Sequence, residues 1–219
     1  MVSPYIKAAL VTVALTLFGF FVIGQLDAMR ANELRASVDD LLIQSESERL
    51  LYTYAQVMGN DSGALCDFVS TSSESQSSRT YALSEKIRYY EQSNLLNADY
   101  QRIKDEYYVS NAALYLNARA MAKYCGTTPY RTVLFFYRVN SDCPECRAQG
   151  GILDTIVSTH DNVRVFAFPA DSNLSFVRLL VKHNNIRAVP SVVIDDSTVL
   201  SGLQSEEQLN RYLGKQNAS

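Results

Sequence analysis

The first pattern along the chain is an unbroken apolar run at residues 8–26. It reads AALVTVALTLFGFFVIGQL and contains no charged residue. As a helix with a rise of about 1.5 Å per residue it would span roughly 28 Å, close to the hydrocarbon thickness of a bilayer. We therefore expect residues 1–26 to carry a single-pass membrane anchor that contacts lipid through residues 8–26. A cleaved signal peptide and a buried core helix are the alternatives for such a run.

Residues 27–126 show helical spacing of apolar positions and no strand pattern. Between Leu34 and Met58 these positions recur mostly every three or four residues, which predicts one long helix that leaves the membrane. The sequence GNDSG at residues 59–63 is expected to end that helix, because glycine and short polar side chains favour turns.

A polar stretch and a helical hairpin are predicted next. The sequence STSSESQSS at residues 70–78 offers little to bury and predicts a connector. Apolar positions at helical spacing then predict a hairpin with arms at residues 80–93 and 98–125. Residues 27–126 are therefore expected to form a coiled or hairpin-like helical region, whose many tyrosines are typical of an amphipathic core face with a wet edge.

After residue 126 the periodicity changes, which predicts a domain boundary and a second domain at residues 127–219. The expected order of elements is strand, helix, strand, helix, strand, strand, helix, at residues 131–139, 144–160, 162–168, 173–185, 190–195, 198–203 and 205–213. Parallel strands need helical crossovers, whereas the last two strands are joined by a tight turn. The pattern therefore predicts an α/β domain with a mixed sheet flanked by helices.

Composition and charge limit the possible functions. With 47% hydrophobic and 20% charged residues, the chain has the composition of a folded protein. Its net charge is −3 and no block of Lys or Arg occurs, which argues against binding of nucleic acid. Four cysteines are too few for a dense disulfide scaffold, so each must be interpreted by its position.

Candidate chemistry lies in the motif Cys143-Pro144-Glu145-Cys146, between the first predicted strand and the helix that follows. A thiolate at a helix start is stabilised by free N–H groups and by the helix dipole, which lowers the pKa of Cys143 below its usual value of about 8.5. Cys146 lies one helical turn later and can attack a mixed disulfide that Cys143 forms with a substrate. The carboxylates of Asp142 and Glu145 oppose the first effect by repelling a thiolate.

Three other interpretations of this motif are open. A zinc site would need a second C-x-x-C or a paired histidine, whereas only isolated cysteines and two separate histidines, His160 and His183, remain, so no metal ligand set is expected. The pair could also be a structural disulfide in a redox-silent binding module, since a fold does not assign a function. Finally, the two could be unrelated buried thiols.

The order of elements, together with C-x-x-C after the first strand and the sequence NIRAVPSVVID, resembles the thioredoxin-like superfamily over residues 131–213. The resemblance implies a cis bond between Val189 and Pro190, with the backbone of Val189 exposed beside the dithiol to pair with a substrate. A trans proline at the start of a strand is the alternative. Tyr137 or a neighbour stands where the family has a buried Asp, and Asp142 stands where it has a Trp.

Cys66 and Cys125 lie towards the start and at the end of the predicted helical region. If both face the same side they can form a structural disulfide, which implies an oxidising compartment. Two separate buried thiols remain the alternative, because their distance cannot be known from sequence.

Together these patterns predict a membrane-tethered thiol–disulfide oxidoreductase with its C-terminal domains outside the cytoplasm. The resemblance implies catalysis by Cys143 and Cys146 and substrate binding at Val189 and Pro190, without metal or dissociable cofactor. Expected partners are cysteine-containing proteins and a redox partner protein, and not nucleic acid. The rival hypothesis is a redox-silent thioredoxin-like binding or scaffold module of a membrane complex.

Overall fold

The computed structural model describes residues 12–13, 15–22, 25, 62–127, 130–139 and 142–214. The chain divides into two compact units, Met1–Asn60 and Asp61–Ser219. The described residues of the first unit are helical, and their large apolar side chains are exposed. No helix among all the described residues is both long and apolar enough to cross a bilayer. Part of the anchor predicted at residues 8–26, and all of the long helix predicted between Leu34 and Met58, falls outside the described residues.

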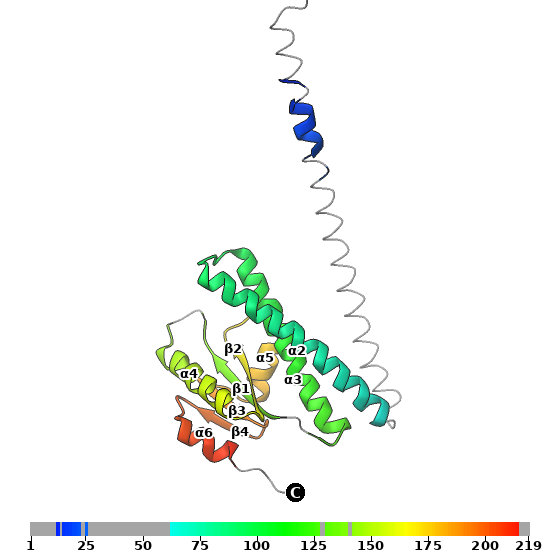
Figure 1. Cartoon of the computed structure of the whole chain (residues 1–219). Helices are drawn as coiled ribbons and strands as arrows, with labels where there is room; N and C mark the ends of the chain where they lie inside the picture. Colours follow the sequence, from blue (N-terminus) through cyan, green and yellow to red (C-terminus); the bar gives the residue numbers. More distant parts are fainter. Residues whose placement is uncertain are drawn as a thin grey trace, which may run out of the picture. The chain divides into compact units, whose positions relative to one another are not determined.

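The second unit combines a helical hairpin with a four-stranded sheet (Figure 1). Its elements are α2 (Ser62–Gln92), α3 (Ala98–Tyr124), β1 (Arg131–Tyr137), α4 (Pro144–Thr159), β2 (Val163–Pro169), α5 (Ser175–His183), β3 (Ser191–Ile194), β4 (Thr198–Ser201) and α6 (Glu206–Leu213). The strand order is β2-β1-β3-β4, with β1 parallel to β2 and antiparallel to β3. This mixed sheet with helices on both sides confirms the fold class expected for the C-terminal part.

Alternation along β1 divides the core between the two faces of the sheet. Successive strand residues point to opposite faces, so Val133 and Phe135 pack with α4 and α6, while Leu134 and Phe136 pack with α3 and α5. All four side chains are buried. The strand is therefore covered on both faces, as its continuous apolar run indicates.

Helix α3 shares one of these cores with the sheet. Its Leu114 and Tyr115 lie in the same cluster as Phe166 of β2 and Val177 of α5. The ring of Tyr115 meets that of Phe166 edge to face, with centroids 5.6 Å apart. The structure therefore places α3 with the strands in one compact unit, whereas the change of pattern after residue 126 predicts a boundary there.

Polar contacts hold α3 to the turn between β3 and β4. Asp195 and Asp196 form this turn with φ of 48° and 56°, a left-handed conformation that Asp tolerates better than most residues. The hydroxyl of Tyr115 donates to Asp196 at 2.6 Å, and Arg119 forms an ion pair with the same carboxylate at 2.6 Å. Arg131 of β1 donates to Asp195 at 2.8 Å. The turn between β3 and β4 is therefore bonded to both α3 and β1.

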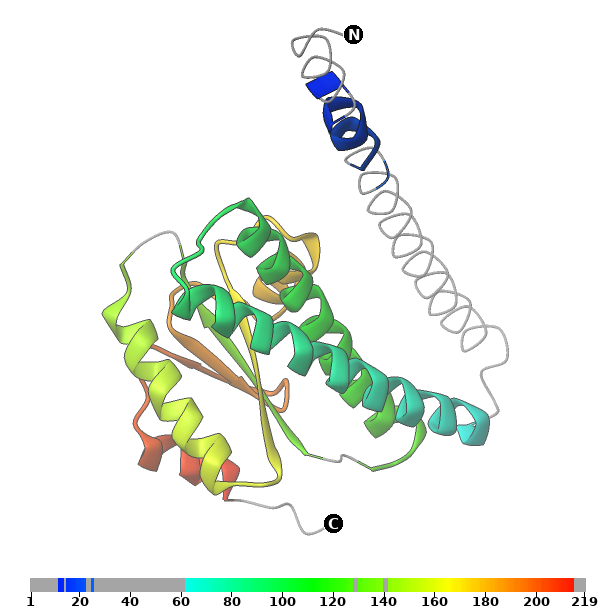
Figure 2. The same ribbon diagram turned by 45° about the horizontal axis from the view of Figure 1, so that its top comes forward.

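The prediction of a connector at residues 70–78 was wrong, because this stretch is part of α2. Its polar side chains find partners on α3, which lies alongside (Figures 1 and 2). Buried Gln76 donates to the backbone oxygen of Ser110 at 3.1 Å, and Thr80 shares a hydrogen bond of 2.8 Å with the Ser110 hydroxyl. Short hydroxyl-bearing side chains let two helices approach closely and satisfy each other, so the polar composition does not end the helix.

The hairpin also covers the edge of the sheet at β2. The side chain of Asn111 donates to the carbonyl oxygen of Ala167 at 3.4 Å, and Arg164 donates to the hydroxyl of Ser77 at 3.1 Å. An uncovered edge strand offers its free backbone groups to other chains. The hairpin therefore occupies one backbone acceptor on this edge and holds one of its side chains.

A disulfide joins Cys66, near the start of α2, to Cys125, directly after α3. This confirms the pairing that was left open by the sequence. The two residues are 59 positions apart, and their Cα atoms lie 5.0 Å from each other. The bond closes the hairpin at the end opposite its turn.

Replacing both hairpin cysteines, as Cys66→Ala with Cys125→Ala, is expected to lower the free energy of unfolding by about 4 kcal/mol, because the unfolded chain regains the entropy of a loop of this length. Urea unfolding followed by circular dichroism measures the change as a lower midpoint. The matched control is Cys143→Ala with Cys146→Ala, whose small loop predicts a smaller loss. Equal midpoints for the hairpin variant and the wild type would contradict a stabilising role.

Candidate functional site

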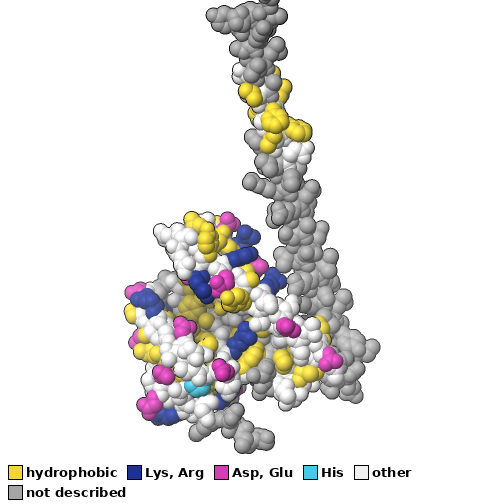
Figure 3. Space-filling view, viewed as in Figure 1, with side chains coloured by type: hydrophobic (Ala, Val, Ile, Leu, Met, Phe, Trp, Pro, Cys, Tyr) yellow, Lys and Arg dark blue, Asp and Glu magenta, His cyan; other side chains and the backbone are white. Residues whose placement is uncertain are grey.

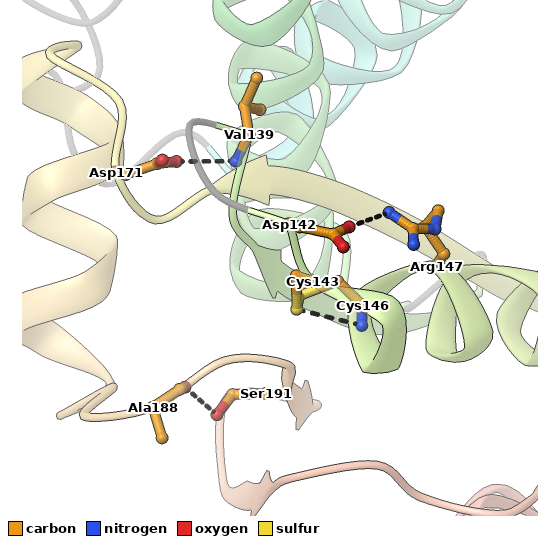
Figure 4. The surroundings of a disulfide bond; sticks show 8 residues. All are labelled: Val139, Asp142, Cys143, Cys146, Arg147, Asp171, Ala188 and Ser191. Carbon is orange, nitrogen blue, oxygen red and sulfur yellow. Dashed lines mark hydrogen bonds and ion pairs between the residues drawn. A yellow bond between two sulfur atoms is a disulfide. The ribbon is translucent and has the colours of Figure 1, made fainter.

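The disulfide between Cys143 and Cys146 lies where β1 leads into α4 (Figure 4). Cys143 caps the N-terminus of the helix, and Pro144 occupies its first turn. Proline suits this place because its φ is already helical and the N–H that it lacks would have no partner inside the helix. The sulfur of Cys143 accepts a hydrogen bond from the backbone N–H of Cys146 at 3.2 Å. When the disulfide is reduced, the helix start is therefore placed to stabilise a thiolate on Cys143.

The two cysteines differ in accessibility. Cys146 is 6% exposed, because it faces the protein one turn into the helix, whereas Cys143 is partly open to solvent. A thiolate of another protein therefore reaches Cys143 first. Cys146 is confined to reactions with its neighbour.

An ion pair flanks the dithiol. The guanidinium of Arg147 lies 2.6 Å from the carboxylate of Asp142, and both side chains are exposed. Asp142 and Glu145 were both expected to oppose a thiolate at Cys143. The pairing with Arg147 offsets part of the effect of Asp142, so Glu145 is the unpaired acid in the first turn of α4 among the described residues.

The turn before β3 lies across from the dithiol. The bond between Val189 and Pro190 is cis, as the resemblance implied. The hydroxyl of Ser191 donates to the carbonyl oxygen of Ala188 at 2.8 Å, and this closed turn faces the Cys143 sulfur in Figure 4. The predicted substrate-binding residues therefore lie on the turn beside the predicted catalytic ones.

A glycine after β4 forms a hydrogen bond with this turn. The backbone N–H of Gly202, directly after β4, donates to the carbonyl oxygen of Pro190 at 2.8 Å. Gly202 has a φ of 81°, a left-handed conformation that glycine adopts without a steric cost. The chain after β4 therefore supports the turn that faces the dithiol.

Sequence reasoning missed Gln149, which attaches α4 to the same region. Gln149 is fully buried, and its side-chain oxygen accepts from the backbone N–H of Gln204 at 2.7 Å. It lies three residues after Cys146, so the two share a face of α4. That spacing was a usable signal, although only the fold shows which loop the amide meets.

Tyr137, at the end of β1, pairs with Tyr108 of α3. Their hydroxyl oxygens lie 2.8 Å apart. Burial raises the pKa of Tyr137 to about 12, and burial raises that of Tyr108 even further. Both hydroxyls therefore stay protonated near neutral pH. Unlike a carboxylate, this pair cannot take a proton from Cys146 under such conditions.

The remaining candidate residues lie elsewhere. Cys66 and Cys125 belong to the hairpin, and the two disulfides account for all four cysteines of the chain. Within the part of the chain that the structure describes, no group of three His, Cys, Asp or Glu side chains could hold a metal ion. The site thus consists of one dithiol, one ion pair and one turn.

Comparisons with known proteins were made for both sequence and structure. No family model matches the chain. No curated protein matches it either. Among solved structures, oxidised mitochondrial thioredoxin 3 from Saccharomyces cerevisiae is 17% identical with a TM-score of 0.33, covering 38% of this chain and 76% of the other. A chloroplastic thioredoxin z is 18% identical with a TM-score of 0.33, covering 39% and 77%.

These likenesses are too distant to support an argument, so the description of the fold rests on the chain's own elements. The sheet order β2-β1-β3-β4, the crossover helix α4 and the dithiol at its N-terminus are consistent with the thioredoxin-like fold expected from the sequence. The structure therefore shows a mixed α/β sheet, flanked by helices, in one compact unit with a helical hairpin.

The ion pair beside the dithiol is expected to tune the reactivity of reduced Cys143. Arg147→Gln leaves Asp142 unopposed and should slow alkylation of Cys143 by iodoacetamide at neutral pH about two- to fivefold. Asp142→Asn should accelerate it by a similar factor, since exposed charges of this kind contribute roughly 0.2–1 kcal/mol. High salt should reduce both differences by screening. Equal rates for wild type and both variants would show that the pair has no electrostatic role.

Proposed function

We propose that this protein is a membrane-tethered thiol–disulfide oxidoreductase that exchanges disulfides with cysteines of other proteins. One observation carries the proposal: Cys143 and Cys146 form a disulfide at a helix N-terminus, with one sulfur accessible and the other buried. Disulfide exchange uses this asymmetry, because a client thiolate attacks the accessible sulfur and the buried sulfur leaves. A purely structural disulfide does not need one accessible and one buried sulfur. The facing turn at Val189 and Pro190 offers backbone groups to an extended client segment.

The chemistry needs only the four sulfurs of the two partners. A client thiolate attacks the sulfur of Cys143, the bond to Cys146 breaks, and its electron pair leaves on Cys146, which takes up a proton. A second client thiolate then attacks the client sulfur of the mixed disulfide and releases Cys143 as a thiolate. The client loses two electrons and the protein gains them, and every step is reversible. A redox partner protein would return the dithiol to its starting state.

The helix N-terminus favours Cys143 as both attacking and leaving group. Its thiolate keeps the hydrogen bond from the N–H of Cys146 and the positive end of the helix dipole. Cys146 lacks these contacts and is buried, which disfavours its charged form. In the mixed disulfide, however, Cys146 is already next to the sulfur that it must attack.

Replacing the resolving cysteine should trap clients. Cys146→Ser is expected to accumulate mixed disulfides in cells, because the covalent intermediate forms and its internal escape is gone. Cys143→Ser should trap far fewer, and the double variant none. Non-reducing gels measure the ladder, which must collapse when reductant is added. If both single variants look like wild type and the purified protein exchanges with no model disulfide, the redox-silent scaffold becomes the better account.

We also propose that residues 8–26 anchor the protein and that its C-terminal unit lies outside the cytoplasm. The uncharged run of 19 residues supports the anchor, and the disulfide between Cys66 and Cys125 suits an oxidising compartment. Described side chains of the run, such as Leu17, Phe18 and Phe20, are exposed, which suits contact with lipid.

Protease added to intact cells or spheroplasts is expected to remove the C-terminal unit while a membrane-embedded N-terminal fragment survives. Labelling with a thiol reagent should modify Cys66 and Cys125 only after reduction. The same treatment of detergent-lysed cells is the control for protease access. Full protection in intact cells, together with free hairpin thiols, would place the unit in the cytoplasm and contradict the proposed location.

A further inference from the structure

A cleft of about 310 Å³ lies between α3 and the loops that follow β1 and β2. We call it the α3 cleft. Its lining includes Lys104, Asp105 and Tyr108 of α3, and Val139, Asp171 and Leu174 of the two loops. It has both apolar and acidic walls, and none of these residues has a part in the dithiol chemistry described above.

The α3 cleft opens at the same end of the sheet as the dithiol. The parallel strands β1 and β2 finish together, with Tyr137 opposite Pro169, so both loops leave from one edge. Val139 precedes Cys143 by four residues, which limits their separation to about 14 Å of extended chain. An extended client segment with its cysteine at Cys143 can therefore reach the cleft within a few residues.

Two hydrogen bonds fix the walls of the cleft. The backbone N–H of Val139 donates to the carboxylate of Asp171 at 3.1 Å, which joins the loop before the dithiol to the loop after β2 (Figure 4). The hydroxyl pair of Tyr108 and Tyr137 joins α3 to the end of β1. The cleft is therefore part of the built structure and does not depend on a loose contact between helix and sheet.

Charge favours a basic occupant. Asp105 is exposed and has no ion pair or hydrogen bond among the described residues, and Asp171 adds a second carboxylate to the lining. The one cation of the lining, Lys104, holds its ammonium over the ring of Tyr100 at 5.2 Å. The cleft thus carries one more negative than positive charge, and Asp105 is the carboxylate open to a partner.

Val139 adds an exposed apolar side chain to this lining, and the tip of the hairpin exposes two more. Val139 is 46% exposed, and Leu95 and Leu96 at the tip of the hairpin are 44% and 59% exposed. Figure 3 shows hydrophobic side chains both at this tip and in the recess between the hairpin and the sheet. Exposed apolar side chains such as Val139 in a polar cleft are common in protein-binding surfaces.

We infer that the α3 cleft binds the polypeptide segment next to the reactive cysteine of a client, and that it selects segments with a basic residue beside an apolar one. The inference rests on the proposed function, which it deepens by naming the class of client. Asp105 would pair with the basic side chain, while Val139 and Leu174 contact the apolar one. The helical hairpin then acts as the specificity element of the dithiol site.

The test compares three substrates with the full-length chain in detergent. Two are synthetic peptides with one disulfide, identical except that Lys-Leu or Glu-Leu flanks the cysteine, and the third is hydroxyethyl disulfide, which has no flanking segment. The wild type should prefer the Lys-Leu peptide by about two- to fivefold in kcat/KM, the effect of one exposed ion pair. Asp105→Lys should reverse the preference and leave the rate with hydroxyethyl disulfide unchanged.

Asp161→Lys is the matched control, because Asp161 is an exposed carboxylate at the start of β2, the opposite end of the sheet. It should keep the wild-type preference. If exchange shows no preference between the peptides, or if the preference survives Asp105→Lys, the α3 cleft does not select clients. The proposed function would stand in both cases. Absence of exchange with all three substrates instead overturns the proposed function, and the inference with it.

Discussion

Parallel pairing of β1 with β2 is the constraint on which the site depends. Two parallel neighbours cannot be joined by a tight turn, so α4 must cross back over the sheet between them. Its N-terminus therefore lies at the edge where β1 ends, and Cys143 caps it there. The same register ends β2 beside Tyr137, which places the loop before α5 at this edge too. Because β1 and β2 end at the same edge, the dithiol and the α3 cleft lie at the same end of the sheet.

The helical hairpin extends the sheet domain into a larger unit. β2 is an edge strand, and α3 covers it through Asn111 while Leu114 and Tyr115 enter the core below. Hydrophobic burial supplies most of the stabilisation in such a contact, and the polar partners fix its orientation. The disulfide at Cys125 then keeps α2 against α3. A hairpin fixed in this way can shape the surroundings of the dithiol without taking part in the chemistry.

Opposing electrostatic effects meet at the dithiol. The helix N-terminus stabilises a thiolate on Cys143, Glu145 opposes it, and the pair of Asp142 with Arg147 is nearly neutral at a distance. Tyr137, protonated near neutral pH, supplies neither charge nor a base. Each of these electrostatic contributions is small, and some are screened by salt. Their sum therefore decides how readily the disulfide is reduced. Under the proposed function, the direction of exchange would follow from this balance together with the potential of a redox partner.

Local pattern by itself determined the element order from residue 131 to residue 213 and the dithiol at a helix start, because periodicity and turn residues act over a few positions. Resemblance added the cis bond before Pro190. The same local reasoning failed at residues 70–78, where partners on α3 make a polar stretch helical.

Only the tertiary structure decided which distant residues meet. The pairing of Cys66 with Cys125, the contact of Tyr108 with Tyr137 and the α3 cleft all join segments separated by many residues. Such contacts depend on how α3 packs against the sheet, and that packing is set by the summed fit of many side chains rather than by any short motif. A sequence pattern can therefore identify the reactive sulfurs, whereas the surface that a client would meet beside them exists only once the hairpin has folded onto β2.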